Sequence, residues 1–552
     1  MSRKSFIHIL LYVLLFIAVV FASIQLSFVF YIDKKIKDHI KEEVTRQTKG
    51  EYEVQIQKLT TNILDQSIYI KGVQLKSVKD VNPNTPKYFV SASEINLQDF
   101  KLFSFLFKKN LILTKLELVN PSGYIFRTGT PNHMAVKQDS TKFSFYKLLK
   151  KYVHSLNVNK IEIKDADIQV FSNKKDTVPS LVSKNNRLNI SNLRIDKSAD
   201  DSGRLFLADS MNLVLNNISY KTKTNLYLIS IKQLVASYTD SQVILDSLEV
   251  VPNYSKEEFA KKARKQTDRF KISAGRLTFN HINVKSLIER NWFIANSLKI
   301  DRINISAYRN KNDVRKYVRA KSVQQLLKSN PIYTVIDSID IKNARVLYEE
   351  VAQGEIHPGN IFFNEIDGVI TGFTNDTTLF SKYNILEFKA SGKFMNKGRI
   401  SVHYDFPLNT EKMVFNCSGK FTEVPFSSIN PMLEPNAKVS MRGGVIDSMI
   451  FSFHANESGS KGKMKLIYHG LKLEFLNKNN KSGIIQDILS FLSHRLIINE
   501  DNPAKNKPAR ITEINYSRDP SRFIFNYSWK SLLSGIKPVI GIPDNKSKKK
   551  KE

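Results

Sequence analysis

Two distant segments of this chain share one alternating pattern, and this repeat restricts the possible folds more than any other feature of the sequence. Residues 52–75 align without a gap on residues 227–250, with Tyr52 on Tyr227. In both segments apolar residues recur at every second position, which places them on one face of a β-strand. We therefore expect strands with one apolar and one polar face, present in two copies.

The repeat continues beyond these segments. Residues 90–106 align on residues 272–288, and residues 148–170 align on residues 326–348. The offsets drift by a few residues, as insertions and deletions in loops would produce. We predict two tandem β units, at 51–225 and 226–360. In each, strands are followed by a short amphipathic helix and then by the motif I-x-I-x-x-A-x-(I/V), which we interpret as a hairpin.

The remainder of the chain supports the same fold class. Alternation continues through residues 361–480, whereas helix-like patterns are few. They occur at residues 142–156, 255–268 and 313–329, in a collar at 34–50, and in C-terminal helices within 481–542, before a basic tail at 543–552. So few helices cannot cover a parallel α/β sheet. The expected fold is mainly β, an elongated and twisted antiparallel sheet with tandem repeats and a few short amphipathic helices.

A long apolar segment near the N-terminus predicts a membrane anchor, placed at residues 1–33. Residues 6–32 contain no Asp, Glu, Lys or Arg, and as a helix they would extend roughly 40 Å, more than the ~30 Å of a hydrocarbon core. A cleavable signal peptide ending near Val20 to Ser23 is the alternative, although its apolar region would be shorter. The anchor prediction rests on Phe6, Leu10, Leu14, Ala22, Phe28 and Tyr31.

The orientation of this anchor is not decided by the flanking charges. Two basic residues precede the segment and four follow it: Arg3 and Lys4 before, and Lys34, Lys35, Lys37 and Lys41 after. The positive-inside rule applied to these residues would leave the body in the cytoplasm, but long domains translocate largely regardless of flanking charge.

Composition indicates a folded and strongly basic protein. Hydrophobic residues make up 41% of the chain, and 84 Lys and Arg against 52 Asp and Glu give a net charge of +32. Such a charge favours anionic partners, including lipid head groups, lipopolysaccharide or nucleic acid. The alternative is that the lysines only solvate the polar strand faces.

The sequence contains no recognisable catalytic or metal-binding signature. Cys417 is the single cysteine, and the ten histidines show no pair at metal-ligand spacing. Carboxylate pairs such as Asp165 with Asp167 lie where turn residues are expected. We therefore predict neither an enzyme nor a cofactor or metal site, and the lack of a nucleic-acid-binding motif argues against that partner.

Three segments resemble the AsmA-like proteins of Gram-negative bacteria, in particular the forms common in Bacteroidetes. The first is "TKGEYEVQIQKLTTNILDQSIYIKGVQL" with the following "YFVSASEINL". The second, residues 424–476, contains an "NP-x-L" turn and "G-x-M-x-L-x-Y-x-x-L". The third is the closing "RDPSRFIFNYSWKSLLSGIK".

The resemblance implies an inner-membrane protein whose body lies in the periplasm and forms a groove with an apolar concave face. Its expected function is to bind or conduct lipid, phospholipid or lipopolysaccharide, in phospholipid transport and outer-membrane biogenesis. The alternative is a non-catalytic scaffold or assembly factor for outer-membrane proteins, with an outer-membrane or periplasmic protein as partner. At 552 residues the chain is short for a complete bridge, and its oligomeric state is left open.

The repeated apolar positions are the candidate lipid groove, although periodicity alone does not distinguish an open groove from a closed core. These positions are Val54, Ile56, Ile68, Ile70, Ile229, Ile231, Val243 and Leu245. Near the C-terminus, Trp529, Leu532, Leu533 and Ile536 follow a helical spacing beside lysines. They predict either a membrane-surface contact or a packed terminal helix.

Overall fold

The structure is a computed structural model. From residue 33 onward it describes the chain except for residues 63, 80–85, 128–152, 174, 199–207, 315–316, 377, 379–383, 477–497 and 543–552. Before residue 33 it describes Phe16, Val19, Val20 and Ser23, which are helical and exposed.

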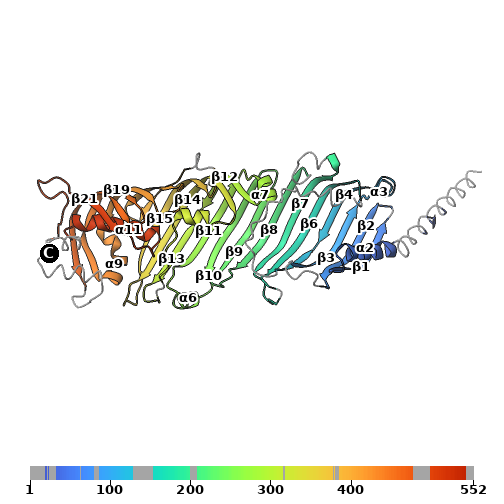
Figure 1. Cartoon of the computed structure of the whole chain (residues 1–552), viewed down its shortest axis with the longest axis horizontal. Helices are drawn as coiled ribbons and strands as arrows, with labels where there is room; N and C mark the ends of the chain where they lie inside the picture. Colours follow the sequence, from blue (N-terminus) through green and yellow to red (C-terminus); the bar gives the residue numbers. More distant parts are fainter. Residues whose placement is uncertain are drawn as a thin grey trace, which may run out of the picture. The chain divides into compact units, whose positions relative to one another are not determined.

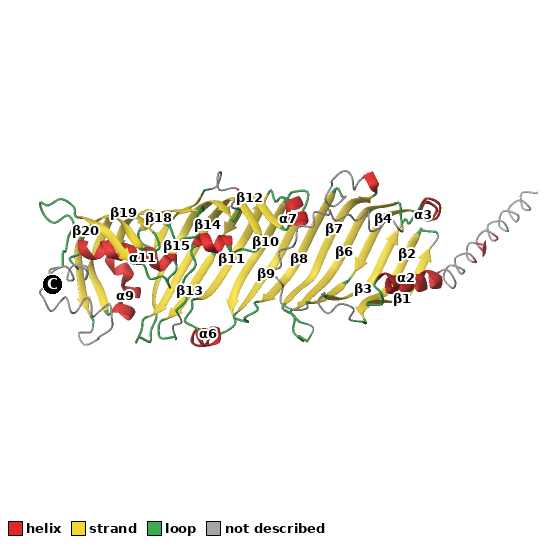
Figure 2. Cartoon of the chain, viewed as in Figure 1, coloured by secondary structure: helices red, strands yellow, loops and turns green. Residues whose placement is uncertain are grey.

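The chain divides into two compact units. The first comprises Met1–Lys221 with Ser230–Gln242, and the second Thr222–Ile229 with Val243–Glu552. Both units are mainly β-sheet with a few short helices (Figures 1 and 2). Strand β9 (Tyr227–Ser237) contributes residues to each unit.

The first unit is a mixed sheet. Its other strands are β1 (Tyr52–Asn62), β2 (Ser67–Ser77), β3 (Lys87–Gln98), β4 (Asn110–Val119), β5 (Ser122–Phe126), β6 (Ser155–Phe171), β7 (Leu181–Ile195) and β8 (Ser210–Lys221). Neighbours β1, β2 and β3 run antiparallel, and β3 also pairs with both β4 and β5. Strands β4 and β5 lie parallel to β6, which continues antiparallel into β7 and β8. The helices are α2 (Asp33–Gln47) and α3 (Leu102–Lys108).

The second unit begins with the same topology. Strand β11 (Arg269–Asn280) pairs with β10 (Gln242–Pro252), β12 (Trp292–Asp301) and β13 (Asn304–Asn310). Both β12 and β13 run parallel to β14 (Tyr333–Val351), which pairs antiparallel with β15 (Gly359–Thr374). Helix α7 (Val284–Arg290) lies between β11 and β12, as α3 lies between β3 and β4.

An antiparallel meander completes the second unit. It comprises β16 (Ile385–Phe394), β17 (Arg399–Pro407), β18 (Phe415–Pro425), β19 (Val439–Ala455), β20 (Gly459–Phe475) and β21 (Ile511–Ser517). Its helices are α6 (Lys256–Ala263), α8 (Val323–Lys328), the 3₁₀ turn η3 (Phe426–Ile429), α9 (Asn430–Ala437) and α11 (Ile524–Val539).

The predicted duplication is confirmed, down to single backbone angles. Residues with positive φ recur at matching positions of the two copies, although most of them are not glycine. These pairs are Gln66 and Ser241, Gly72 and Ser247, Asp99 and His281, Lys109 and Asn291, Asn120 and Arg302, Asp165 and Asn343, and Asn185 and Glu365. A left-handed residue is costly outside glycine, so its recurrence at the same sites reflects one repeated fold.

Two expectations about the strands were wrong. The sheet is mixed, not antiparallel throughout, because β6 and β14 each receive two parallel neighbours. The motif I-x-I-x-x-A-x-(I/V) forms no hairpin. It lies within one long strand, β6 or β14, which carries a bulge where Asp165 or Asn343 has positive φ. A bulge bends a strand without ending it.

The helix predictions were partly correct. The collar is α2, and the pattern at 255–268 contains α6. The pattern at 313–329 contains only the six-residue α8, which begins with a capping box from Ser322 and Gln325. Strand β21 lies in the region predicted to be helical, together with α11. A helix was also predicted at 142–156. Its last two residues are instead the first two of strand β6, which starts at Ser155, and its residues 142–152 lie outside the described residues. The basic tail lies outside them as well.

The large hydrophobic core lies in the meander of the second unit. Helix α11 packs there against β20 and β21, and α9 packs against β19 and the neighbouring β14 and β15. Phe415, Leu466 and Tyr468 are at most 1% exposed, and Tyr527 and Val539 of α11 are buried with them.

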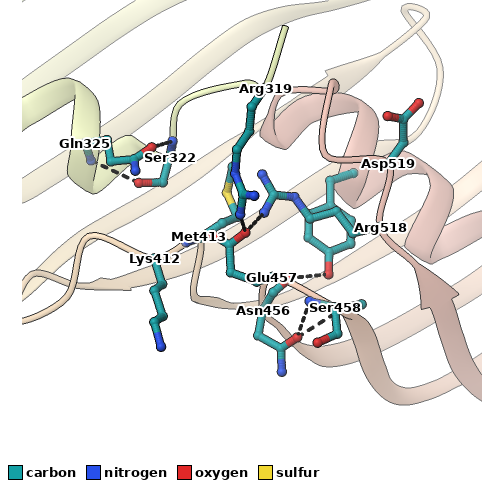
Figure 3. Close-up of polar contacts among 12 residues, drawn as sticks. Arg319, Ser322, Gln325, Lys412, Met413, Asn456, Glu457, Ser458, Arg518 and Asp519 are labelled. Carbon is teal, nitrogen blue, oxygen red and sulfur yellow. Dashed lines mark hydrogen bonds and ion pairs between the residues drawn. The ribbon is translucent and has the colours of Figure 1, made fainter. Parts of the chain in front are cut away.

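One end of this core is held by a buried ion pair. The Arg518 side chain is 1% exposed and pairs with Glu457, which also pairs with Arg319. The backbone N–H of Met413 donates to Glu457 Oε1 at 2.6 Å, and Figure 3 shows these groups meeting at one carboxylate. The contact joins the connection before α8, the turn between β19 and β20, and the segment before α11.

Within the part of the chain that the structure describes, no helix is long and apolar enough to span a membrane. The predicted anchor residues Phe6, Leu10, Leu14, Ala22, Phe28 and Tyr31 lie outside the described residues.

Candidate functional site: an uncovered apolar sheet face

Aliphatic side chains in the first unit stand in direct register across successive strands. One such row, which we call the outer ladder, crosses seven strands, and an inner ladder crosses six beside it. The outer ladder is Leu59, Ile70, Ile95, Leu118, Ile163, Leu188 and Leu213. The inner ladder is Ile68, Leu97, Leu116, Ile161, Ile190 and Met211. Register partners of this kind lie about 5 Å apart at Cβ and form a continuous apolar surface.

The second unit repeats both ladders. Leu245, Leu277, Ile300 and Ile341 match the outer ladder, and Val243, Phe279, Leu298, Ile339 and Ile370 match the inner one. Where the outer ladder has Leu188, the second unit has Gly368. The duplicated sequence thus produces a duplicated apolar surface.

A change of alternation phase keeps this surface continuous along a strand. In β2 the apolar residues are Ile68 and Ile70, followed by Val73 and Leu75, and Gly72 between them has a φ of +62°. A Cβ at Gly72 would lie 2.3 Å from the end of the flexible Gln57 side chain, which would have to move, whereas glycine adopts this left-handed backbone without strain. Without this irregularity Val73 and Leu75 would point to the polar face.

The ladders are not covered by a second layer in the way that the meander is. Of the eight candidate groove residues, Ile56 is buried at 6% exposure, and Val54, Ile68, Ile70, Ile229, Ile231, Val243 and Leu245 are half-buried. Only small clusters are fully buried on this face, around Val158 and Ile161 in the first unit and around Ile336 and Ile339 in the second. Side chains that are covered only by their neighbours on the same sheet face, and not by a second layer, are expected to be half-buried along the whole strand.

The structure brings Val54, Ile56, Ile68 and Ile70 onto one face of the first unit, together with residues that sequence reasoning missed. Strands β4, β6, β7 and β8 supply Leu118, Ile163, Leu188 and Leu213. Their alternation was visible in the sequence, but the parallel pairing that aligns them was not.

A polar line interrupts the face where β7 and β8 bend. Asn186 Oδ1 accepts hydrogen bonds from the Ser183 hydroxyl at 2.7 Å and from the Asn216 N–H at 2.9 Å. Gln233 of β9 donates to Asn216 Oδ1 at 2.9 Å. Asn186 is 2% exposed, and its Nδ2 has no hydrogen-bond partner. These amides satisfy backbone groups that the bulges leave outside the sheet ladder.

The opposite face of the first unit carries a network of charges. Glu117 and Glu162 are register partners on β4 and β6. Hydrogen bonds from Lys164 first, and from Asn96 and Lys115, lower the pKa of Glu117 to about 2. Hydrogen bonds from Lys160 and Lys115 lower the pKa of Glu162 to about 2. One face is therefore apolar and the other ionic, as the alternation predicts.

Helices lie along the outermost strands. Asp33 of α2 accepts from the Thr61 N–H at 3.2 Å, and Lys37 donates to the Gln57 carbonyl at 3.1 Å. In the second unit, Ser534 of α11 accepts from the Asn515 N–H of β21 at 3.1 Å. Side chains of these helices thus bond to individual backbone groups of the two edge strands.

The C-terminal helix α11 is a packed helix. Leu532 is buried at 9% exposure and Ile536 packs against the same core, whereas Trp529 and Leu533 are half-buried. Leu532 and Ile536 therefore do not form a membrane-facing surface, because their side chains fill the core between α11 and the sheet.

One histidine lies beside two carboxylates. His403 Nε2 is 2.8 Å from Glu387 Oε1 and 2.9 Å from Asp405 Oδ1. All three are half-exposed, and Lys389 also pairs with Glu387 at 2.6 Å. The group forms an ordinary ion-pair cluster on the polar face of β16 and β17.

No family model matches the chain, and no curated protein matches it.

Proposed function

We propose that this protein binds lipid acyl chains along its uncovered apolar ladders and thereby conducts phospholipid from the inner membrane, where an N-terminal helix anchors it, toward the outer membrane. The body then lies in the periplasm, and lipid transport serves outer-membrane biogenesis. The observation that carries the proposal is the pair of apolar ladders, repeated in both units and half-buried at most of their positions.

Burial of a methylene group stabilises a complex by about 0.8 kcal/mol, so a surface of this kind can hold an acyl chain without any specific bond. Rows of apolar side chains at equal spacing also present the same surface to each segment of the bound acyl chain. Movement along them breaks no strong contact, and it requires no catalytic residue.

The alternative of a scaffold for outer-membrane proteins depends on an exposed sheet edge that accepts a further strand. Helix α2 bonds to two backbone groups of β1 and lies along it, and α11 bonds to one backbone N–H of β21 and packs along it. These contacts favour the lipid-binding proposal over strand addition.

Site-specific photo-crosslinking tests the proposal in the full chain. A benzophenone amino acid replaces Ile70 or Leu245 on the apolar face, and matched controls replace Gln74 or Thr278 on the same or the adjacent strand, on the polar face. In cells grown with radioactive phosphate, we expect labelled lipid to be crosslinked at Ile70 and Leu245 but not at the controls. Equal labelling at both faces, or labelling at neither, rejects the proposal. Crosslinks to a protein at Ile70 would support the scaffold instead.

A further inference from the structure

A second surface lies on the polar face of the second unit, over the meander and the two strands before it. A hollow of about 900 Å³ extends there across β14 to β21. The exposed side chains of its lining lie on the face away from the core: Lys463 and Lys465 alternate along β20 with Met464 and Leu466, which are at most 1% exposed and belong to the core. The hollow is therefore separate from the apolar ladders.

The hollow is strongly basic. It is lined by five lysines, Lys342, Lys389, Lys420, Lys463 and Lys465, and by two aspartates, Asp340 and Asp367. Asp367 is paired with Lys342 at 3.1 Å, and Lys389 is paired with Glu387. Among the described residues, Lys420, Lys463 and Lys465 form no ion pair, although Glu513 is the register partner of Lys463.

Small hydrogen-bonding groups lie between these cations. His403, Ser418, Ser452 and Lys463 are consecutive register partners across β17 to β20. Serine hydroxyls together with lysine ammonium groups are the usual donors to phosphate oxygens. A second hollow of about 380 Å³, which also includes His454 and Lys461, adjoins this row.

Exposed apolar side chains stand among the same lysines. Ile450 is 53% exposed and lies in register between Lys420 and Lys465, and Ile511, next to Lys465, is 64% exposed. Val369 is 41% exposed in the same hollow. Free phosphate would need only the cations. A ligand with both a phosphate and an apolar part would also cover these side chains.

We propose that this hollow binds the phosphate head group of an anionic phospholipid. Lys420, Lys463 and Lys465 contact the phosphate, the hydroxyls of Ser418 and Ser452 donate to its oxygens, and Ile450 and Ile511 contact the beginning of the acyl chains. The site does not depend on the proposed conduction of lipid, because it lies on the other face of the sheet and uses different residues.

Lysine footprinting tests this site in the full chain held in a neutral maltoside detergent. The rate of acylation is measured by mass spectrometry at Lys420, Lys463 and Lys465, and at Lys271 and Lys299 as internal controls. These controls are exposed on the polar faces of β11 and β12 of the same unit. Because a lysine held by a phosphate is shielded from the reagent, we expect phosphatidylglycerol in mixed micelles to slow acylation in the hollow about fivefold and at the controls hardly at all. Phosphatidylcholine should have little effect.

Three results would overturn the proposal. Equal protection of hollow and control lysines would show a diffuse effect of the positive field. No protection by phosphatidylglycerol would show that the hollow is empty of lipid. Equal protection by inorganic phosphate at the same concentration would show that the hollow binds free phosphate and does not recognise the lipid.

Charge-matched variants provide an independent measurement. Lys463→Gln with Lys465→Gln removes two charges from the hollow, and Lys271→Gln with Lys299→Gln removes two from the control surface. We expect the first double variant to bind a fluorescent phosphatidylglycerol at least about tenfold more weakly than the second, since each lost contact is charge-assisted. Equal affinities would contradict the site. All four side chains are exposed, so both variants should fold.

Discussion

The hydroxyl of Tyr227 accepts a hydrogen bond from the backbone N–H of Phe270 at 3.1 Å. In the first repeat, the Tyr52 hydroxyl accepts from the N–H of Tyr88 at 3.3 Å. The aligned tyrosines therefore make the same contact in both copies, tying the first strand of each repeat to the third. The duplication has preserved a side-chain interaction as well as the strand pattern.

This contact should stabilise each copy separately. Tyr227→Phe deletes the acceptor and leaves the Phe270 N–H without it, so we expect a loss of about 1 kcal/mol in the free energy of unfolding of the second unit. Urea unfolding, followed with a probe in that unit, measures the loss. Tyr52→Phe should have the same effect on the first unit. Tyr317→Phe is a control, because Tyr317 is 69% exposed. An equal loss in the control would contradict the assignment.

The cost of truncating leucines should distinguish the uncovered face from the closed core. Leu466 is 0% exposed in the meander, and Leu277 is half-buried on a ladder of the same unit. Leu466→Ala should lower the free energy of unfolding by about 2–5 kcal/mol, because it leaves a cavity. Leu277→Ala should cost only about 1 kcal/mol, because part of its side chain is already in water. Equal costs would indicate that the ladder is covered like a core.

The carboxylates of the first unit should make its stability depend on acid. Glu117 and Glu162 have pKa values near 2 in the fold, below the usual 4.5. Their contribution is complete above pH 4.5 and is lost as the pH falls toward 2. Since their lysine partners are partly exposed, we expect each to contribute about 1 kcal/mol. Thermal unfolding of Glu117→Gln with Glu162→Gln between pH 2 and 5 should show a flatter pH dependence than the parent chain, and an unchanged slope would refute the assignment.

The Glu457 carboxylate should contribute strongly to the stability of the second unit, because it holds one end of the hydrophobic core. Although burial opposes it, the hydrogen bond from Met413 and the charges of Arg518 and Arg319 hold the pKa of Glu457 below its usual range. Glu457→Gln leaves the Arg518 guanidinium buried without a counter-charge, and we expect a loss of about 3–5 kcal/mol. Arg319→Gln is the matched control, because Arg319 is 60% exposed and its loss should cost less than about 1 kcal/mol. Chemical denaturation compares the two variants.

Cys417 offers a direct report on the opening of the core. It is 2% exposed, and burial raises the pKa of its thiol to about 12. The reactive thiolate is therefore scarce in the folded state. A maleimide should label the native chain very slowly and label it quickly in denaturant. Glu457→Gln should accelerate labelling of the native chain, whereas Arg319→Gln should not. Rapid labelling of the parent chain would show that the core is open.

Strand positions and their duplication could be predicted from the sequence, because alternation and phase are local properties. Residues 52–75 and 227–250 contain strand pairs with the same bounds after alignment, β1 with β2 and β9 with β10. The sequence also shows where the apolar/polar alternation changes phase, at Gly72 and Ser247. A strand's apolar face depends on its own residues, so short-range pattern is sufficient to identify it.

Tertiary structure alone decided which strands are neighbours and which faces are covered. The parallel pairing of β4 and β5 with β6 depends on a long connection, and no local pattern specifies its path. Likewise, Leu466 and Leu277 occupy similar alternating positions, but α9 and α11 pack over the sheet at the meander and the adjoining β14 and β15, where Leu466 lies in the core and Leu277 does not. The basic hollow has the same origin: Lys420, Ile450 and Lys465 are far apart in sequence and meet only through strand register. Register and layering depend on contacts between distant segments, and these contacts form only when the whole chain folds.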